Sequence, residues 1–552
     1  MSKNINLYKK LYKEKKYEEI IYKIENSEHT KSPQLFHILG ICKLSKKNVS
    51  KDDKLSARED FRKAFESDKN SNIGIEALTN FINISTDFLL VDESLKYYNE
   101  IKEKFPTNIQ LLKSISRVYQ FNLMTDERIE LLEKIIHLNP LSIDDWCSYM
   151  YINNFKTNWK QKDYYEISKK FSENIKIINS KKIKIDDSID NRKIKIAFFS
   201  SDINQTHSIT YFLKTVLKNI NKNKFEVFII SNSRNDQYKE DYKVYIKEWF
   251  NIRDLDDLNA LSFIREKKFD IIFDLMGLTG ENRINLFKNR IAPIQISWLG
   301  YCNTLGLNEI DYIFSDTNLI FNEEDKFYSE KVVKLDNIWS THIGFNLPRA
   351  MIPTPSIKNG YITFGSFNNF NKISDETLEV WGSILKKIDN SKLLLKSSAN
   401  LNTENFKKKI KKIGLERQIQ FVPTIKNFND HLNYYDNIDL SLDTFPYNGV
   451  TTTFEAIWKG IPVLTMEGYN FNSRCGASII KNLGIEYLVA KNQDDYTSKA
   501  IFLSKNLNEL IKIRKIVFDK ALDSPLFDTK KYTKNFEKKL DYLIKKELEN
   551  KI

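Results

Sequence analysis

The stretch Asp443–Glu455, DTFPYNGVTTTFE, has the pattern of a strand, a loop and a helix in an α/β protein. The apolar run before it predicts a buried strand, and the residues after it predict a helix, a glycine turn and a second strand. The loop holds Asn448 and Gly449, and the helix begins with Thr451 and Thr452. Glycine lets the backbone approach a ligand closely, and free N–H groups in a first helical turn attract anions, so the pattern predicts a phosphate site. The alternative is a helix whose threonines serve only as its cap.

Two other loops follow predicted strands in the same way. The stretch 365–381, GSFNNFNKISDETLEVW, places Lys372 at the carboxyl end of a strand. The stretch 274–306 places Gly277 and Thr279 after the run FDIIFDL. In open α/β sheets, ligands bind outside the carboxyl ends of the strands. Three such loops therefore predict a ligand site at which they meet.

Residues from about 193 to 520 resemble the catalytic region of the O-linked N-acetylglucosamine transferase family (glycosyltransferase family 41, with plant SPINDLY-type and bacterial relatives). The resemblance rests on strings that occur in the family's order: SSDINQTHS (200–208), FDIIFDLMGLTGENR (269–283), RIAPIQISWLGYCNTLG (290–306), DYIFSDTNLI (311–320), SFNNFNKISDETLEVW (366–381), HLNYYDNIDLSLDTFPYNGVTTTFEAIWKGIPVLTM (431–466) and SRCGASIIKNLG (473–484). It implies the GT-B fold, in which two Rossmann-like α/β lobes face each other, and a UDP-sugar donor.

Length and composition bound the class of protein. At 552 residues we expect two to four domains, and 41% hydrophobic with 29% charged residues is typical of a soluble globular protein. No apolar run approaches the roughly 20 residues that span a bilayer, and the N-terminus lacks a signal-peptide core, so we expect a cytoplasmic protein. The four cysteines form no CxxC pair, which argues against a disulfide framework or a zinc site. The net charge is +13, but the lysines are spread along the chain and mixed with Asp and Glu. A nucleic-acid site would need a cluster of basic residues, so we expect no nucleic-acid partner.

The region 1–180 is expected to be all helical. Its apolar residues recur at helical spacing, and QLFHILGICKL (34–44) has the pattern of a first tetratricopeptide helix, with Gly40 where paired helices meet. Pro106 and Pro140 lie 34 residues apart, which is the period of that repeat. We expect a short α-solenoid that binds acceptor proteins, and an unrelated helical bundle is the alternative.

Alternating strands and helices predict a first lobe at 193–340, a second at 355–525 and a C-terminal helix at 526–552. That last helix either packs on a lobe or is a solvated surface helix. The strands expected in the first lobe are KIAFFSSD (195–202), FEVFIIS (225–231), FDIIFDL (269–275), PIQISWLG (293–300) and DYIFSD (311–316). Those expected in the second are YITFGSF (361–367), KLLLKSS (392–398), QIQFVP (418–423), DLSLDT (439–444), PVLTM (462–466) and EYLVA (486–490).

The resemblance assigns donor contacts. Lys372 matches the family's lysine that contacts the diphosphate, and we expect it to be catalytic, with a solvated loop lysine as the alternative. His431 matches a histidine that packs on the uracil ring, with a surface-helix histidine as the alternative. The other expected donor-binding residues are Asn368, Asn369, Asn448, Gly449, Thr451, Thr452 and Glu455, the last toward the ribose. The chain departs from the family at Asn369, where glutamine is usual, and at Val450, where histidine is frequent.

On the acceptor side, His207 is expected to be catalytic, either as a base toward the acceptor hydroxyl or as a binding residue. We expect four further residues to line the acceptor site: Gly277, Thr279, Tyr301 and Thr304. Arg283 and Arg474 are expected to support loops, and the DxD string Asp254–Asp256 to be solvated surface rather than a metal site.

We therefore expect an inverting, metal-independent transferase that moves a sugar, N-acetylglucosamine by resemblance, from a UDP donor to Ser or Thr of proteins. No cofactor and no metal are expected, since the UDP-sugar is a substrate. One alternative is a transferase of the same fold that places glucose on Asn or uses another nucleotide sugar. Another is an inactive repeat-containing scaffold. The oligomeric state, a homodimer included, is left open.

Overall fold

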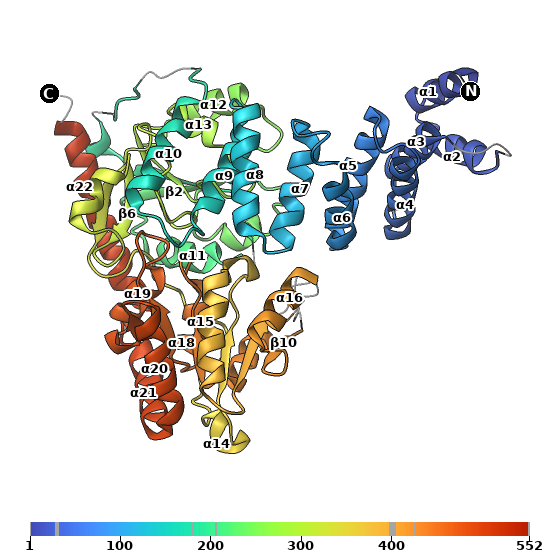
Figure 1. Cartoon of the computed structure of the whole chain (residues 1–552). Helices are drawn as coiled ribbons and strands as arrows, with labels where there is room; N and C mark the ends of the chain where they lie inside the picture. The colour runs from blue at the N-terminus through green and yellow to red at the C-terminus, as the bar shows by residue number, and fades with distance from the viewer. Residues whose placement is uncertain are drawn as a thin grey trace. The chain divides into compact units, whose positions relative to one another are not determined.

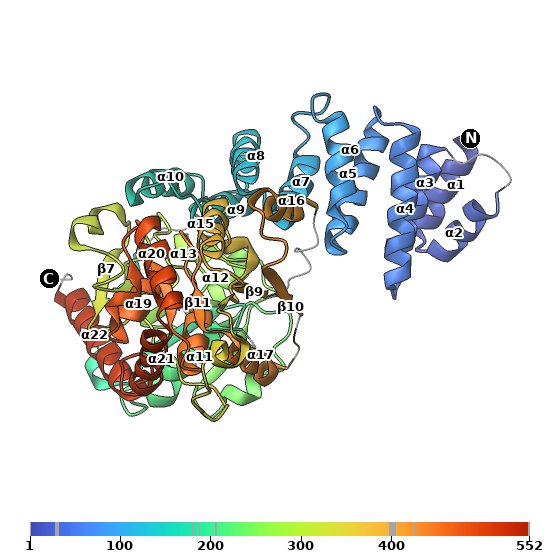
Figure 2. The ribbon, with the colours of Figure 1, turned by 60° about the horizontal axis from the view of Figure 1, so that its bottom comes forward.

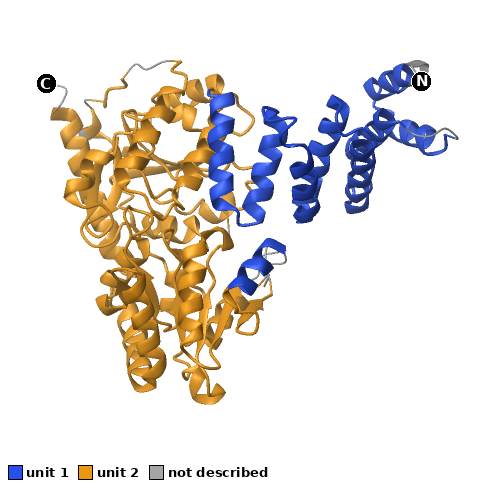
Figure 3. Ribbon diagram, in the orientation of Figure 1, with its two compact units in different colours: residues 1–140, 398–412 blue, residues 141–397, 413–552 orange. Residues whose placement is uncertain are grey.

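The computed structural model describes residues 2–27, 32–178, 182–186, 188–204, 207–396, 404–423, 425 and 427–549. The chain forms two compact units, which Figure 3 shows in different colours. Unit 1 comprises residues 1–140 and 398–412, and unit 2 comprises residues 141–397 and 413–552.

Unit 1 is a stack of α-helices, each in contact with the next (Figure 1). The helices are α1 (Ser2–Lys13), α2 (Tyr17–Glu25), α3 (Pro33–Leu44), α4 (Lys51–Ser67), α5 (Asn72–Asp87), α6 (Val91–Ile101), α7 (Ile109–Phe121) and α8 (Thr125–Leu138). Helices α6 and α8 begin 34 residues apart, as the repeat period predicts. A Cβ atom on Gly40 would lie 2.7 Å from the ring of Phe61 in α4, so the predicted close approach at Gly40 is confirmed.

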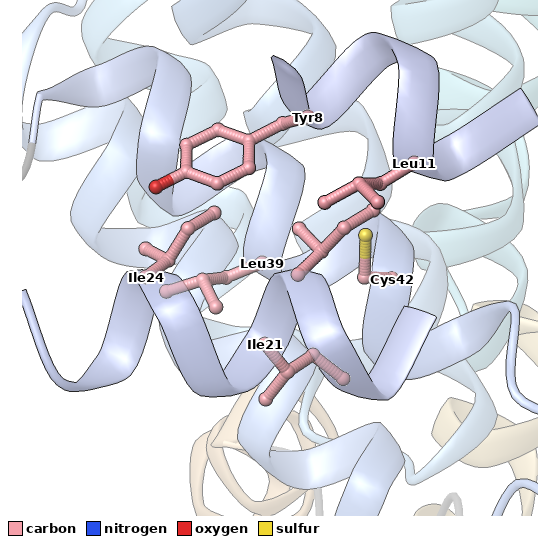
Figure 4. Packing of buried hydrophobic residues seen from close by; sticks show 7 residues of the cluster. Tyr8, Leu11, Ile21, Ile24, Leu39 and Cys42 are labelled. Atoms are coloured by element: carbon pink, nitrogen blue, oxygen red, sulfur yellow. The ribbon is translucent and has the colours of Figure 1, made fainter. Parts of the chain in front are cut away.

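The ends of unit 1 are built differently. Near the N-terminus, the first three helices share a small core (Figure 4) made by Tyr8, Leu11, Ile20, Ile21, Ile24, Leu39 and Cys42. Helix α16 (Glu404–Ile413) also packs with this unit, although it comes from much later in the sequence. The amide of Asn405 donates to the carbonyl of Asn122, and Lys409 donates to the carbonyl of Leu123.

The first sheet of unit 2 is wholly parallel, and its seven strands among the described residues run in the order β3-β2-β1-β4-β5-β6-β7. Their bounds are β1 (Ile194–Ser200), β2 (Phe225–Ser231), β3 (Glu248–Asn251), β4 (Ile271–Asp274), β5 (Ile294–Ser297), β6 (Tyr312–Asp316) and β7 (Lys331–Leu335). The helices of this lobe are α11 (Ile209–Asn219), α12 (Asp257–Glu266) and α13 (Ile284–Lys288). Because the strand order reverses between β1 and β4, the loops that follow these two strands lie at a topological switch point.

The second sheet is also parallel, with the order β10-β9-β8-β11-β12-β13 among the described residues. Its strands are β8 (Thr363–Ser366), β9 (Lys392–Lys396), β10 (Ile419–Val422), β11 (Leu440–Leu442), β12 (Val463–Met466) and β13 (Val489–Ala490). Its helices, several of which Figure 2 shows over the sheet, are α14 (Pro355–Asn359), α15 (Asp375–Lys386), α17 (Phe428–Tyr434), α18 (Thr451–Trp458), α19 (Cys475–Asn482), α20 (Gln493–Lys505) and α21 (Leu507–Ala521). The switch point of this sheet lies between β8 and β11. Lys372 lies in the loop after β8, and the stretch 443–455 follows β11.

These two lobes confirm the predicted α/β fold class with a preceding helical region. Every strand predicted from the sequence is present, although the last two residues of the stretch 392–398 lie outside the described part. Strands β3 and β7 were not predicted. Both lie at edges of the first sheet, where one side of the strand faces solvent and charged residues replace the apolar run.

Three further helices complete unit 2: α9 (Ile143–Asn153), α10 (Gln161–Glu173) and α22 (Thr529–Glu549). The region expected as one helical domain, 1–180, thus divides between the units at residue 140. Helix α22 packs on the first lobe, because Phe536 inserts among Phe273, Trp298 and Phe314. Among the described residues, no helix is both long and apolar enough to cross a membrane.

Candidate active site

Lys372 joins the loops that follow β8 and β11. It ends a short 3-10 helix, Phe370–Lys372, directly after β8, and its ammonium group donates a 2.8 Å hydrogen bond to the carbonyl of Asn448. The ammonium also lies 4.5 Å from the centre of the Tyr447 ring. Burial lowers the pKa of Lys372, and the nearby Asp443 carboxylate opposes that shift. Lys372 is therefore a half-buried cation held inside the predicted phosphate loop, and the alternative of a solvated loop lysine is wrong.

Asp443 organises this loop, a role that was not predicted from the sequence. One carboxylate oxygen accepts hydrogen bonds from the backbone N–H of Gly449 (2.7 Å) and from the side-chain amide of Asn368 (3.1 Å). The other accepts from the hydroxyl of Thr465 (2.7 Å) in β12. Burial raises the pKa of Asp443 to about 6. Its place directly after a buried strand and before the glycine loop is the signal that could have identified it.

The start of α18 is fastened to the loop after β8. The hydroxyl of Thr452 donates a 2.7 Å hydrogen bond to the amide oxygen of Asn368. A Cβ atom on Gly449 would lie 2.6 Å from both of these oxygens, so any other residue there would displace one of the two side chains. Within the described part of the chain, the N–H groups of Thr451 and Thr452 have no backbone partner, as expected in a first helical turn. The helix start thus leaves two N–H donors beside the loop, and anion binding there stays a prediction.

Glu455, one turn further along α18, is held by two side chains. His431 Nε2 lies 3.1 Å from one of its carboxylate oxygens, and the hydroxyl of Tyr435 donates to the same oxygen at 2.8 Å. His431 is buried in α17 beside the ring of Phe367, so the alternative of a surface-helix histidine is wrong. The roles expected from the resemblance, ribose for Glu455 and uracil for His431, stay predictions.

The two asparagines of the loops differ in their surroundings. Asn448 is buried, donates to the carbonyl of Thr444 (2.9 Å) and accepts from the N–H of Gly476 (3.2 Å), which ties the loop to α19. Asn369 is exposed, and its side-chain oxygen accepts from the N–H of Asn371. Asn448 therefore shapes the loop through its side chain, whereas the side chain of Asn369 caps the short 3-10 helix that ends at Lys372.

His207 lies in the first lobe, on the loop that joins β1 to α11. It is exposed, its backbone N–H donates to Asn204, and Nε2 lies 3.8 Å from a carboxylate oxygen of Asp202. Burial raises the pKa of Asp202, and His207 opposes that shift. The loop belongs to the switch point of its sheet, as Lys372 does in the second lobe, and the catalytic role of His207 stays a prediction.

Gly277 and Thr279 shape the loop after β4. Gly277 has a positive φ of 55°, and a Cβ atom there would lie 2.4 Å from the side chain of Tyr301. Its N–H donates to the buried Asp274, whose pKa burial raises to about 6. The hydroxyl of Thr279 donates to the carbonyl of Met276 (2.8 Å) and is half-buried.

Tyr301 and Thr304, expected to line the acceptor, lie in the interior instead. The hydroxyl of Tyr301 is hydrogen bonded to that of Tyr164 and accepts from Asn154. The hydroxyl of Thr304 donates to Glu330 at 2.6 Å, and burial raises the pKa of Glu330 to about 7. Both hydroxyls are thus engaged within the protein, and a direct contact with an acceptor stays a prediction.

Asn154, the residue after α9, links the two lobes beside Tyr301. This link was not predicted. Its amide donates to Tyr301 (2.9 Å), and its oxygen accepts from Asn303 (2.8 Å), both in the first lobe. The same oxygen accepts from Asn472 (2.7 Å) in the second lobe. The neighbouring Phe155 stacks on Tyr447, the ring beside Lys372. No local sequence pattern signals such a link, because its partners lie about 150 and 320 residues away.

The residues expected to have structural roles have them. Arg474 makes two hydrogen bonds to Glu324, of 2.5 and 2.8 Å, and so joins the second lobe to the first. Arg283 pairs with Asp257 in α12. Asp256 is exposed and caps α12, which confirms that the DxD string is surface.

Comparison with known proteins shows the family of this chain. The family model described as glycosyl transferase family 41 matches residues 167–346 and 338–536. The chain belongs to glycosyltransferase family 41. The resemblance of the sequence to this family is thereby confirmed.

The match to individual relatives covers only part of their length. A protein of Solanum lycopersicum named "Probable UDP-N-acetylglucosamine--peptide N-acetylglucosaminyltransferase SPINDLY" is 33% identical over 355 residues, 63% of this chain and 38% of that protein. The Arabidopsis thaliana protein of the same name is 33% identical over 348 residues, 61% of this chain and 38% of that protein. The chain thus matches well under half of the length of these relatives.

A solved structure has a similar fold over most of this chain. An O-GlcNAc transferase variant from Thermobaculum terrenum matches with a TM-score of 0.80 at 21% identity, covering 91% of this chain and 96% of that one. The family 41 chain therefore has the GT-B fold that its two parallel sheets indicate.

Proposed function

We propose that this family 41 chain transfers N-acetylglucosamine from UDP-N-acetylglucosamine to Ser or Thr hydroxyls of proteins, with inversion and without a metal. The observation that carries the proposal is the hydrogen bond from Lys372 to Asn448, which holds an ammonium group at the loop leading into α18. The names of the plant relatives support the donor and the peptide acceptor. A cytoplasmic setting is part of the proposal.

The chemistry requires that negative charge on the departing UDP be stabilised. The acceptor oxygen attacks the anomeric carbon from the face opposite the UDP, the bond from that carbon to the β-phosphate oxygen breaks, and both electrons leave with the UDP. The ammonium of Lys372 and the free N–H groups of Thr451 and Thr452 would receive this charge. Such fixed donors cost no reorganisation when the charge develops.

The acceptor hydroxyl must also lose its proton. His207 is exposed on a switch-point loop beside the Asp202 carboxylate, so it would accept this proton or hold the acceptor in place. Glu455, fixed by His431 and Tyr435, would accept hydrogen bonds from the ribose. The stacked helices of unit 1 would bind the acceptor protein.

The test is to incubate the purified protein with a panel of labelled nucleotide sugars and a cell lysate, and to locate the linkage by mass spectrometry. The proposal predicts label from UDP-N-acetylglucosamine on Ser or Thr, retained in the presence of EDTA. Glucose found on Asn, or transfer from another nucleotide sugar alone, would contradict the proposal. It would favour the alternative transferases of the same fold instead. No transfer from any donor would favour an inactive scaffold.

A further inference from the structure

A groove lies between β7, at the edge of the first sheet, and the C-terminal helix α22. Its volume is about 430 Å³. Its lining residues come from β6, from β7 and the Asp336 that follows it, and from α22. None of the residues assigned to the candidate active site lines it, so the proposed transferase chemistry does not account for it.

The strand on one side of this groove has an open edge. Strand β7 pairs only with β6 among the described residues. The N–H of Lys331 donates to the carbonyl of Asp311 (2.9 Å), so the amide groups of Lys331 face β6. Because consecutive residues of a strand point their amide groups to opposite sides, those of Val332 and Lys334 face the open edge.

The groove is strongly basic. Five lysines and one carboxylate, Asp336, line it. Two of the lysines have acidic partners, Lys334 with Asp325 at 3.4 Å and Lys539 with Asp336 at 3.2 Å. The remaining three, Lys331, Lys538 and Lys546, have no carboxylate within salt-bridge distance among the described residues. The groove thus keeps an excess of positive charge.

The groove also has apolar walls. Tyr312, Val333 and Leu543 are buried side chains that line it, and the Tyr542 ring beside them is exposed. Lys331 and Val333 lie on the face of β7 that α22 covers, because Phe314, the partner of Val333 in β6, packs on Phe536 of α22. Acidic side chains on that face of an added strand would therefore meet the lysines of the groove.

We propose that this groove binds an acidic protein segment in extended conformation, which adds a strand beside β7. The open edge offers both N–H donors and carbonyl acceptors at Val332 and Lys334, and a peptide backbone satisfies both. A phosphodiester backbone or a lipid phosphate offers acceptors only, and would leave the two carbonyls without partners. The lysines select acidic side chains by charge.

The test measures binding of a fluorescent peptide with alternating Glu and Val to the full-length protein by fluorescence anisotropy. The matched control peptide alternates Lys and Val. The acidic peptide should bind and the basic one should not. The double change Lys331→Glu and Lys538→Glu should weaken binding at least tenfold. The double change Lys387→Glu and Lys505→Glu should leave binding unchanged, because these exposed lysines lie in the second lobe, directly after α15 and at the end of the neighbouring α20.

Two measurements separate strand addition from charge attraction alone. Val332→Pro removes the outward N–H and should weaken binding at least tenfold, whereas Val332→Ala keeps this group and should bind as the unchanged protein does. In the unchanged protein, hydrogen exchange at Val332 and Lys334 should slow when the peptide binds. Unaltered exchange, or equal binding of an oligonucleotide or of anionic vesicles that compete with the peptide, would overturn the proposal.

Discussion

The ammonium group of Lys372 lies 2.8 Å from the backbone carbonyl of Asn448, which fixes a cation of the loop after β8 against the loop after β11. Parallel strands bring these loops together, because β8 and β11 are neighbours on either side of the switch point in their sheet. The ammonium of Lys372 is thereby placed at the loop that leads into α18.

Lys372→Ala should lower kcat about 100-fold or more, because one fixed donor to the departing diphosphate is lost. Lys387→Ala is the matched control, since Lys387 is an exposed lysine at the end of α15 in the same lobe. Steady-state transfer assays on both variants, with circular dichroism to verify folding, measure the difference. Equal activity of the two variants would contradict the assigned role.

Glu455→Ala should raise KM for the donor about tenfold and change kcat less, because a ribose contact binds substrate and transition state alike. Tyr435→Phe removes one hydrogen bond to this carboxylate and should give a smaller change in the same direction. Initial rates at varied donor concentration separate the two constants. A fall in kcat at unchanged KM would assign Glu455 to the chemical step instead.

Gly277→Ala should destabilise the protein by about 2 kcal/mol or more, because a Cβ atom there meets Tyr301 and the positive φ strains any other residue. Gly280→Ala in the same loop is the control, since nothing lies within 4 Å of a Cβ atom at Gly280. Thermal unfolding of both variants measures the effect. Similar Tm values would show that the loop rearranges freely.

Asp443 should make stability depend on pH. Burial raises its pKa from 3.8 to about 6, so the folded protein binds more protons than the unfolded chain between these values. The contribution of this group to the free energy of unfolding is therefore full below about pH 4 and falls as pH rises through 6, by roughly 3 kcal/mol in total.

Asp443→Asn does not titrate at this position. Its stability relative to the unchanged protein should therefore improve as pH rises from 4.5 to 7, in chemical denaturation at both pH values. If the difference in the free energy of unfolding between the two proteins is the same at pH 4.5 and at pH 7, Asp443 is ionised throughout this range.

The sequence was sufficient for the predicted strands and for the loops that carry Lys372 and Asn448, because buried parallel strands are continuous apolar runs and phosphate loops need glycine. It was insufficient for β3 and β7, whose exposed edges break that pattern. It was also insufficient for Asn154 and for the buried settings of Tyr301 and Thr304. These depend on packing between segments far apart in the chain, which no local pattern encodes.

The most direct test is a crystal structure of the protein with UDP. We predict that the diphosphate oxygens accept hydrogen bonds from the ammonium of Lys372 and from the N–H groups of Thr451 and Thr452 at the start of α18. A diphosphate bound elsewhere, with Lys372 still directed at Asn448 and the helix start facing only solvent, would contradict it.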